Sequence, residues 1–271
     1  MNHQQKFINL ALSESIRIDN RAVYDYRKVQ FLFSENVSGQ VQVNLGNTKI
    51  LAKVSGEISR PTASNPHEGI LQFNIDFSQM SDQKFESKFT ERELNITMLL
   101  EKALKKSKAV DVEGLCLVAG KKVWSIRVDL RVLDNDGNIT DCACIAAITS
   151  LLHFKRPEVT VQGDELTIHS TEDKHPIPLS IHHIPICTTF GFFDDGQYLV
   201  VDPCLVEEQT MESEMTVVMN VHREVCTISK SGGVPLEIDQ ILRCCQIGSI
   251  KAGEVTNLIR NAIHGVSPDS L

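Results

Sequence analysis

Four glutamates lie close together just before a predicted strand over residues 215–221. They are Glu207, Glu208, Glu212 and Glu214. Carboxylate oxygens are the ligands that hard divalent cations prefer, so such a group could hold a metal ion. A solvated cluster of charges beside a strand is the commoner role for acidic residues at these spacings. The glutamates alone therefore do not identify a site.

Two further segments could bind a metal by residue type but have the wrong spacing. Asp134-Asn135-Asp136-Gly137 superficially resembles a calcium loop, yet the earlier acidic ligand and the closing glutamate are missing, so we interpret it as a turn. His182 and His183 are adjacent on a predicted strand, where their side chains would point to opposite faces and could not share one ion. We expect no metal site.

Motifs for nucleotide and acyl chemistry are absent from the sequence. It contains no GxxxxGK[ST], no GxGxxG and no GxSxG. The absence of these motifs disfavours P-loop kinases, dinucleotide-binding enzymes and serine hydrolases as functions of this chain.

Hydrophobic patterning predicts the elements that must position these residues. Residues 123–132 alternate apolar and polar side chains, which predicts a strand with one buried face. The other predicted strands span 29–33, 40–45, 48–55, 69–77, 181–192, 198–202, 215–221 and 224–228. Helices are predicted over 1–20, over 142–152, and over 238–263 with candidate bends at Gly248 and Gly253. A further helix is predicted after Thr90 and Glu93, whose spacing is that of a capping box at a helix N-terminus. Each half thus shows several strands followed by helix, which predicts an α+β fold of two sheet-and-helix units.

Composition limits the classes of function. The chain has 271 residues, of which 42% are hydrophobic, so it can bury a substantial core. Its net charge of −8 has the wrong sign for a protein that binds nucleic acid over its whole surface, so any RNA contact must be local. The eight cysteines include no CxxC pair, which indicates reduced thiols. The sequence contains no apolar run of about 18 residues, so no membrane span is predicted.

Several segments together resemble the ribonuclease PH superfamily over nearly the whole chain. They are Arg17-Ile18-Asp19-Asn20-Arg21, Trp124-Ser125-Ile126-Arg127-Val128-Asp129-Leu130, Asp136-Gly137-Asn138, Ser180-Ile181-His182-His183-Ile184-Pro185 and Val218-Met219-Asn220. Residues 124–147, 155–157 and 161–165 are most similar to ring subunits of the eukaryotic RNA exosome. The resemblance implies an N-terminal helix and arm at 1–28 and two ribonuclease PH-type domains at 29–178 and 179–271. Each domain would be like domain 2 of ribosomal protein S5.

Catalytic members of this superfamily cleave RNA from its 3′ end with inorganic phosphate, which a Gly-Thr-Arg segment holds just before a helix. A helix N-terminus offers free N–H donors, and the arginine adds a bidentate contact. The matching positions here are Asn138, Ile139 and Thr140, so the arginine is missing. We expect Asp141 to place a negative charge at this position and to cap the helix.

The superfamily's two catalytic aspartates correspond by resemblance to Glu208 and Glu214, each longer by one methylene group. Such a shift of a carboxylate can cost orders of magnitude in rate. We therefore expect no catalytic residue and no cofactor. The resemblance makes six residues candidates for RNA contact, namely Arg60, Arg92, Lys102, Lys105, Lys106 and Lys108. Lys121 and Lys122, in a predicted turn, serve as reference lysines.

The resemblance also implies protein partners and cellular locations. The chain would be a non-catalytic member of a six-subunit ring, paired with ribosomal RNA-processing protein 41. Cap subunits with S1 and KH domains would bind one face and a hydrolytic nuclease the other, in the nucleus, the nucleolus and the cytoplasm. One rival is an active phosphorolytic exoribonuclease, which the missing Gly-Thr-Arg segment disfavours. A free-standing RNA chaperone, the other rival, is disfavoured by the net charge of −8.

Overall fold

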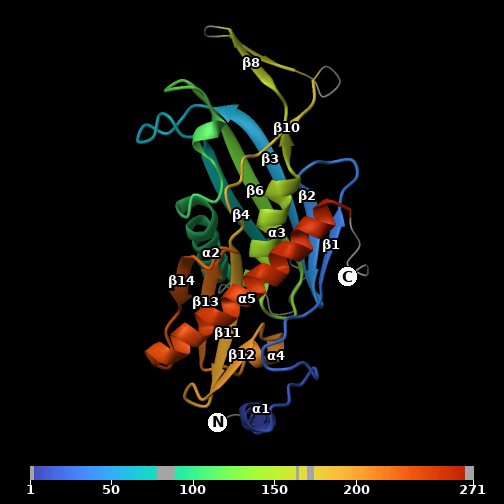
Figure 1. Ribbon diagram of the computed structural model, residues 1–271, viewed down its shortest axis with the longest axis vertical. Coiled ribbons are helices and arrows are strands. Elements are labelled where there is room, and N and C mark those ends of the chain that lie inside the picture. Colours follow the sequence, from blue (N-terminus) through green and yellow to red (C-terminus); the bar gives the residue numbers. More distant parts are fainter. Residues whose placement is uncertain (1–2, 78–88, 163–164, 170–173, 266–271) are drawn as a thin grey trace.

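A computed structural model describes residues 3–77, 89–162, 165–169 and 174–265 of the chain. Two main sheets follow one another along the long axis of the molecule, the larger in the upper half of Figure 1 and the smaller in the lower half. Helices pack against both sheets. The α+β class with an N-terminal helix is thereby confirmed, while the predicted domain boundaries at 28 and 178 stay predictions.

The larger sheet has six strands in the order β1-β2-β3-β6-β4, with β5 paired to β6. Only β4 runs parallel to its neighbour, β6, and the other pairs are antiparallel. Alternation along β6 buries Trp124, Ile126, Val128, Leu130 and Val132. The strands are β1 Val29–Phe33, β2 Gln40–Leu45, β3 Thr48–Ser59, β4 Ile70–Phe77, β5 Cys116–Val118 and β6 Lys122–Asp134.

The central helix α3, Ile139–His153, joins the two halves of the molecule. It packs against β2 and β3 of the larger sheet and against β11 of the smaller one. A helix enclosed on all sides must be apolar on all sides, and α3 is buried from Ile139 to Leu151. The prediction of a buried helix over 142–152 is confirmed, with three more residues at its start.

The smaller sheet has four strands in the order β12-β11-β13-β14, all antiparallel. They are β11 Ile186–Phe193, β12 Tyr198–Val201, β13 Ser213–Met219 and β14 Val225–Lys230. The short helix α4, Leu205–Glu208, lies between β12 and β13 in sequence. The helix α5, Ile238–Ile263, covers β11 and β13 and is continuous through Gly248 and Gly253, so neither glycine breaks it.

The remaining described elements lie at the edges of these layers. Helix α1, His3–Ser13, packs Ile8 and Leu12 against Phe193 and Val200 of the smaller sheet. Helix α2, Phe89–Leu100, packs on β4 and continues as a π-helix over Glu101–Lys106. A 3-10 helix spans Glu113–Leu115, and two small ribbons pair β7 Lys155–Arg156 with β10 Ile177–Pro178 and β8 Val159–Gln162 with β9 Glu165–Ile168.

Two predicted elements are shorter than expected. The N-terminal helix ends at Ser13 rather than at residue 20, because the chain turns through Ser15, whose φ is 58°. The strand predicted from 181 begins only at Ile186, after Pro185, which has no N–H to donate to a ladder. His182 and His183 therefore precede the strand, and the prediction that they lie within it is wrong. All eight cysteines are free thiols.

Candidate functional site

The first turn of α3 lies against α4, near the middle of the molecule. Asn138 caps the helix in a left-handed conformation, with φ 51° and ψ 49°, which asparagine tolerates better than most residues. The preceding Gly137 has φ +84°, and a Cβ there would lie 2.5 Å from the backbone nitrogen of Leu205. Only glycine permits this approach. It brings α4, and with it Glu208, to the N-terminus of α3.

Glu208 is bound at that N-terminus. Its Oε1 accepts a hydrogen bond from the backbone N–H of Asn138 at 2.6 Å. Arg92 of α2 donates from Nη2 to both carboxylate oxygens, at 3.2 and 3.0 Å. A helix N-terminus and an arginine are the donors with which proteins commonly hold phosphate groups. Here both donors are engaged by a carboxylate of the same chain.

A depression of about 300 Å³ opens beside this ion pair. Arg92, Lys102, Thr140 and Glu214 are among the residues that line it. Burial, and then the nearby charge of Glu208, raise the pKa of Glu214 to about 7. Metal ligands must be deprotonated, so a carboxyl group that is partly protonated at neutral pH binds a cation weakly. The two carboxylates of the site thus differ: Glu208 is ion-paired, and Glu214 is partly protonated at neutral pH.

The expectation that Asp141 caps α3 is wrong. Asn138 is the cap, and the carboxylate at its N–H is that of Glu208. Asp141 is fully buried and accepts hydrogen bonds from the hydroxyl of Tyr26, the amide of Asn138, and the N–H and hydroxyl of Thr189. Its burial raises its pKa, and these hydrogen bonds oppose that rise. Asp141 therefore ties α3 to the smaller sheet.

A buried ion-pair network lies beneath the site, and sequence reasoning missed it. Asp202 is fully buried and binds Arg27 at 2.9 Å (Nε) and 2.8 Å (Nη2), and Arg21 at 2.9 Å. Asn138 donates its amide to the same carboxylate at 2.6 Å. Burial alone would raise the pKa of Asp202, but the arginines outweigh it and keep that pKa below its usual range. The network holds the cap of α3 in place.

A second ion pair of this kind anchors α4 to the N-terminal segment. Arg17, only 2% exposed, contacts both carboxylate oxygens of Glu207, at 3.0 and 2.6 Å. A buried charge needs a partner, so three arginines at 17, 21 and 27 could have indicated buried pairs. Sequence spacing could not supply the partners, because Arg17 and Glu207 are 190 positions apart.

The predicted RNA-binding residues fall into two separate places. Arg92 and Lys102 line the depression beside Glu214. Lys105, Lys106 and Lys108 continue from it along the π-helix and the turn that follows, and their side chains are exposed. Arg92 is engaged with Glu208, so it is less available for RNA than the lysines.

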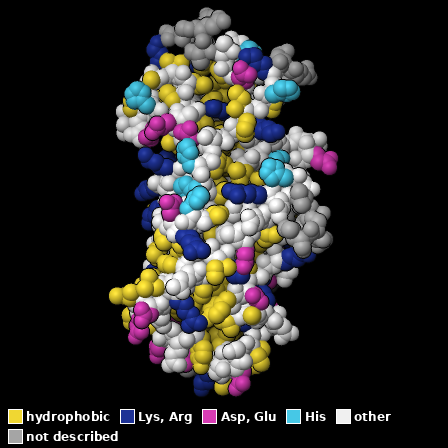
Figure 2. Space-filling model, viewed as in Figure 1, with side chains coloured by type: hydrophobic (Ala, Val, Ile, Leu, Met, Phe, Trp, Pro, Cys, Tyr) yellow, Lys and Arg dark blue, Asp and Glu magenta, His cyan; other side chains and the backbone are white. Residues whose placement is uncertain are grey.

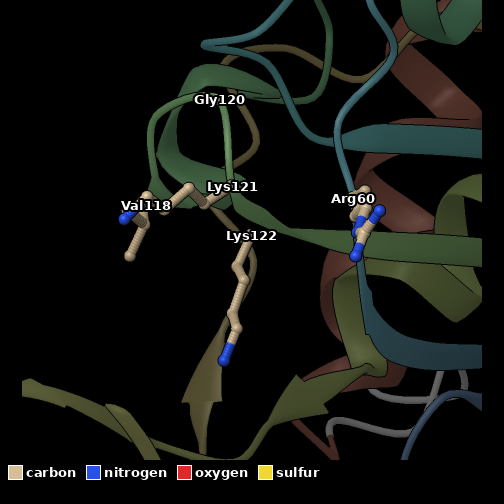
Figure 3. Close-up of a pocket in the computed structure, with 5 residues that line it drawn as sticks. All are labelled: Arg60, Val118, Gly120, Lys121 and Lys122. Carbon is tan, nitrogen blue, oxygen red and sulfur yellow. The ribbon is translucent and has the colours of Figure 1, made fainter. Parts of the chain in front are cut away.

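Arg60 lies elsewhere, at the end of β3. It lines a second depression with Lys121 and Lys122, the two lysines intended as a reference away from the RNA candidates (Figure 3). That use of the two lysines is therefore wrong. In the described part of the chain, no group of three His, Cys, Asp or Glu side chains is arranged to hold a metal ion. None of the helices described is both long and apolar enough to cross a bilayer.

Comparison with known proteins places these features in a family. Residues 25–157 match domain 1 of the 3′ exoribonuclease family (RNase PH), and residues 183–251 match its domain 2. The chain is 37% identical over 262 residues to exosome complex component rrp45 of Schizosaccharomyces pombe, covering 96% of this chain and 90% of that protein. The chain belongs to the 3′ exoribonuclease family, among its RRP45 members.

The RRP45 relative from Homo sapiens is longer than this chain, which spans less than two thirds of it. Exosome complex component RRP45 of Homo sapiens is 47% identical over 263 residues, which cover 97% of this chain but 60% of the human protein. The fold agrees with a solved chain from the Archaeoglobus fulgidus exosome with RNA bound to the active site. That comparison has a TM-score of 0.82 at 23% identity and covers 94% of this chain and 96% of the other.

Proposed function

We propose that this chain is a non-catalytic ring subunit of the RNA exosome core. It would support 3′-to-5′ processing of rRNA and decay of mRNA by completing the ring and guiding RNA. The RRP45 relatives are named as exosome components, and the fold is that of archaeal exosome chains. The observation that carries the non-catalytic part is the carboxylate of Glu208, which engages the N–H of Asn138 and Arg92.

The bound carboxylate disfavours phosphate at the same position for an electrostatic reason. A phosphate ion would need the donors that Glu208 already satisfies, and it would meet that negative charge at short range. Asn138, Ile139 and Thr140 stand where the catalytic relatives have Gly-Thr-Arg, so no second arginine compensates. The rival function, an active phosphorolytic exoribonuclease, would require Glu208 to leave.

The isolated chain is expected to release no nucleoside diphosphate from single-stranded RNA, with or without phosphate and magnesium. The reason is Glu208, which engages the N–H of Asn138 and Arg92 and would repel an anion at the N-terminus of α3. The measurement is chromatography of labelled products, with an active ribonuclease PH as positive control. Phosphate-dependent release at a comparable rate by the purified chain would contradict the proposal.

Exposed apolar surface supports a subunit that works in an assembly. Ile238, Leu242 and Ile250, on one face of α5, are 76%, 55% and 62% exposed. In Figure 2 hydrophobic side chains gather over the lower half of the molecule, where α5 crosses the smaller sheet.

We expect the chain to form a stable one-to-one complex with a second ribonuclease PH-like subunit, ribosomal RNA-processing protein 41. Binding of the folded state raises apparent stability, so the complex should melt at a higher temperature than the chain alone. Size-exclusion chromatography with light scattering and a thermal melt measure both. A monomer whose melting temperature does not change on adding that partner would count against ring membership.

The remaining parts of the proposal rest on the family. Cap subunits with S1 and KH domains would bind one face of the ring, and the hydrolytic nuclease the other. RNA would pass the exposed lysines that follow α2, namely Lys102, Lys105, Lys106 and Lys108. The assembly would work in the nucleus and nucleolus and also in the cytoplasm.

A further inference from the structure

A basic depression at the end of the larger sheet lies apart from the site at α3. Its volume is about 440 Å³, and the described residues that line it are Arg60, Val118, Gly120, Lys121 and Lys122. Arg60 follows the end of β3, Lys121 lies in the turn before β6, and Lys122 is the first residue of β6 (Figure 3). Three of these described lining residues are cations, and none of the described ones is a carboxylate. Its chemistry is therefore that of an anion site.

Strand pairing brings the cations together. β3 and β6 are antiparallel, and their last register pair at this end is Ser59 with Val123. The next position along each strand places Arg60 across from Lys122. Like charges directly opposite each other in a sheet are destabilising. The two side chains together therefore give this end of the sheet a local positive potential.

Backbone contacts fix the turn that carries the lysines. The N–H of Gly120 donates to the carbonyl of Pro66 at 2.9 Å, and the N–H of Lys121 donates to the carbonyl of Val118 at 3.0 Å. Gly120 has φ +73°, which suits a tight turn. The loop after Arg60 and the turn at 118–121 are thus held side by side, and the depression is part of the fold.

Neither Arg60 nor Lys122 forms an ion pair within the described residues, although both lie close to other cations. Guanidinium groups bind phosphate through paired N–H donors, and ammonium groups bind it as point charges. We propose that this depression binds the phosphate backbone of single-stranded RNA. The proposal rests on the RNA-guiding function above and adds a second contact, far along the sheet from the lysines after α2.

Two observations favour an RNA backbone over an acidic peptide. Peptide and protein partners are usually anchored by apolar or aromatic side chains in pockets, and Val118 is the single apolar side chain among the described residues of this lining. None of these described residues has an aromatic ring on which a base could stack, which predicts contact with phosphates and little preference for sequence. Because the net charge is −8, such a local cluster is the form that an RNA contact must take here.

The test measures how affinity for a fluorescent oligouridine depends on salt, using the full chain. Each phosphate contact on a single strand contributes roughly −0.7 to the slope of log affinity against log salt, so Arg60→Ala with Lys122→Ala should flatten the slope by about 1.4. Arg60→Lys keeps the charge and should keep the slope. The control is Lys6→Ala with Lys28→Ala, which removes two exposed cations outside the depression and should leave the slope unchanged.

Two further arms separate this proposal from the proposed function. Lys105→Ala with Lys108→Ala probes the lysines after α2. If the salt slope flattens in that variant but not in the Arg60 and Lys122 variant, the depression is not an RNA site. The proposed RNA-guiding function would then still hold through the lysines after α2. Tighter binding of polyglutamate than of oligouridine, lost in the Arg60 and Lys122 variant, would also overturn it, in favour of an acidic partner. Thermal melts of each variant should match the parent, since exposed substitutions usually change stability by less than about 0.5 kcal/mol.

Discussion

Asp202→Ala is expected to lower the free energy of unfolding by about 3–5 kcal/mol, the usual cost of removing one partner from a buried ion pair. Asp202 is fully buried and binds Arg27, Arg21 and Asn138. Without the carboxylate, Arg27, which is only 9% exposed, would keep its charge in the interior with much of its compensation removed. Urea unfolding followed by tryptophan fluorescence, through Trp124, measures the loss.

A surface ion pair provides the matched control. Asp76 and Arg131 approach to 3.5 Å, but their side chains are 55% and 63% exposed. Exposed pairs typically contribute less than about 1 kcal/mol, so Asp76→Ala should have little effect. If both variants lose a similar free energy of unfolding, Asp202 contributes no more to stability than a surface carboxylate does. The ion-pair network would then not be what holds the cap of α3.

Glu214→Gln is expected to stabilise the protein at pH 8 and to leave its stability at pH 5 nearly unchanged. The pKa of Glu214 is raised from 4.5 to about 7 by burial and by Glu208. Between these values the folded protein holds a proton that the unfolded chain has lost. Stability of the parent therefore falls as pH rises from about 4.5 towards 7. At about 1.36 kcal/mol per pKa unit, the full shift corresponds to roughly 3 kcal/mol.

Glutamine stays neutral at every pH, so the variant should lack that fall in stability. Denaturant unfolding at pH 5 and pH 8 gives the difference directly. Glu57→Gln, at an exposed position on β3, controls for the loss of one negative charge. If parent and Glu214→Gln lose the same stability between pH 5 and pH 8, the carboxyl group is not the source of the pH dependence.

The two predictions describe one site in which carboxylates have different tasks. Asp202 and Glu207 are held by arginines and position the chain around α3 and α4. Glu208 is held by Arg92 and by the N-terminus of α3. Glu214 lies near Glu208, and burial together with that like charge makes its own negative charge costly. A site of this kind stabilises the subunit, in keeping with the proposed non-catalytic function.

Local patterning in the sequence determined most of the elements. The period-two alternation of β6 and the uniformly apolar α3 are each visible within a few residues, because one face of a strand, or every face of an enclosed helix, must leave water. The helix over Ile238–Ile263 was predictable for the same reason. Segment resemblance added the family and the departure at Asn138, Ile139 and Thr140.

Tertiary structure decided which charged residues meet. Arg17 and Glu207 are 190 positions apart, and Asn138 and Glu208 are 70 apart. No periodicity connects residues at such distances, because their approach depends on how α3, α4 and the N-terminal segment pack. The same holds for Arg60 and Lys122, which strand pairing brings together. Local sequence fixes which side chains are buried or turned outward, whereas the electrostatic partner of each charge is set by the packing of the whole chain.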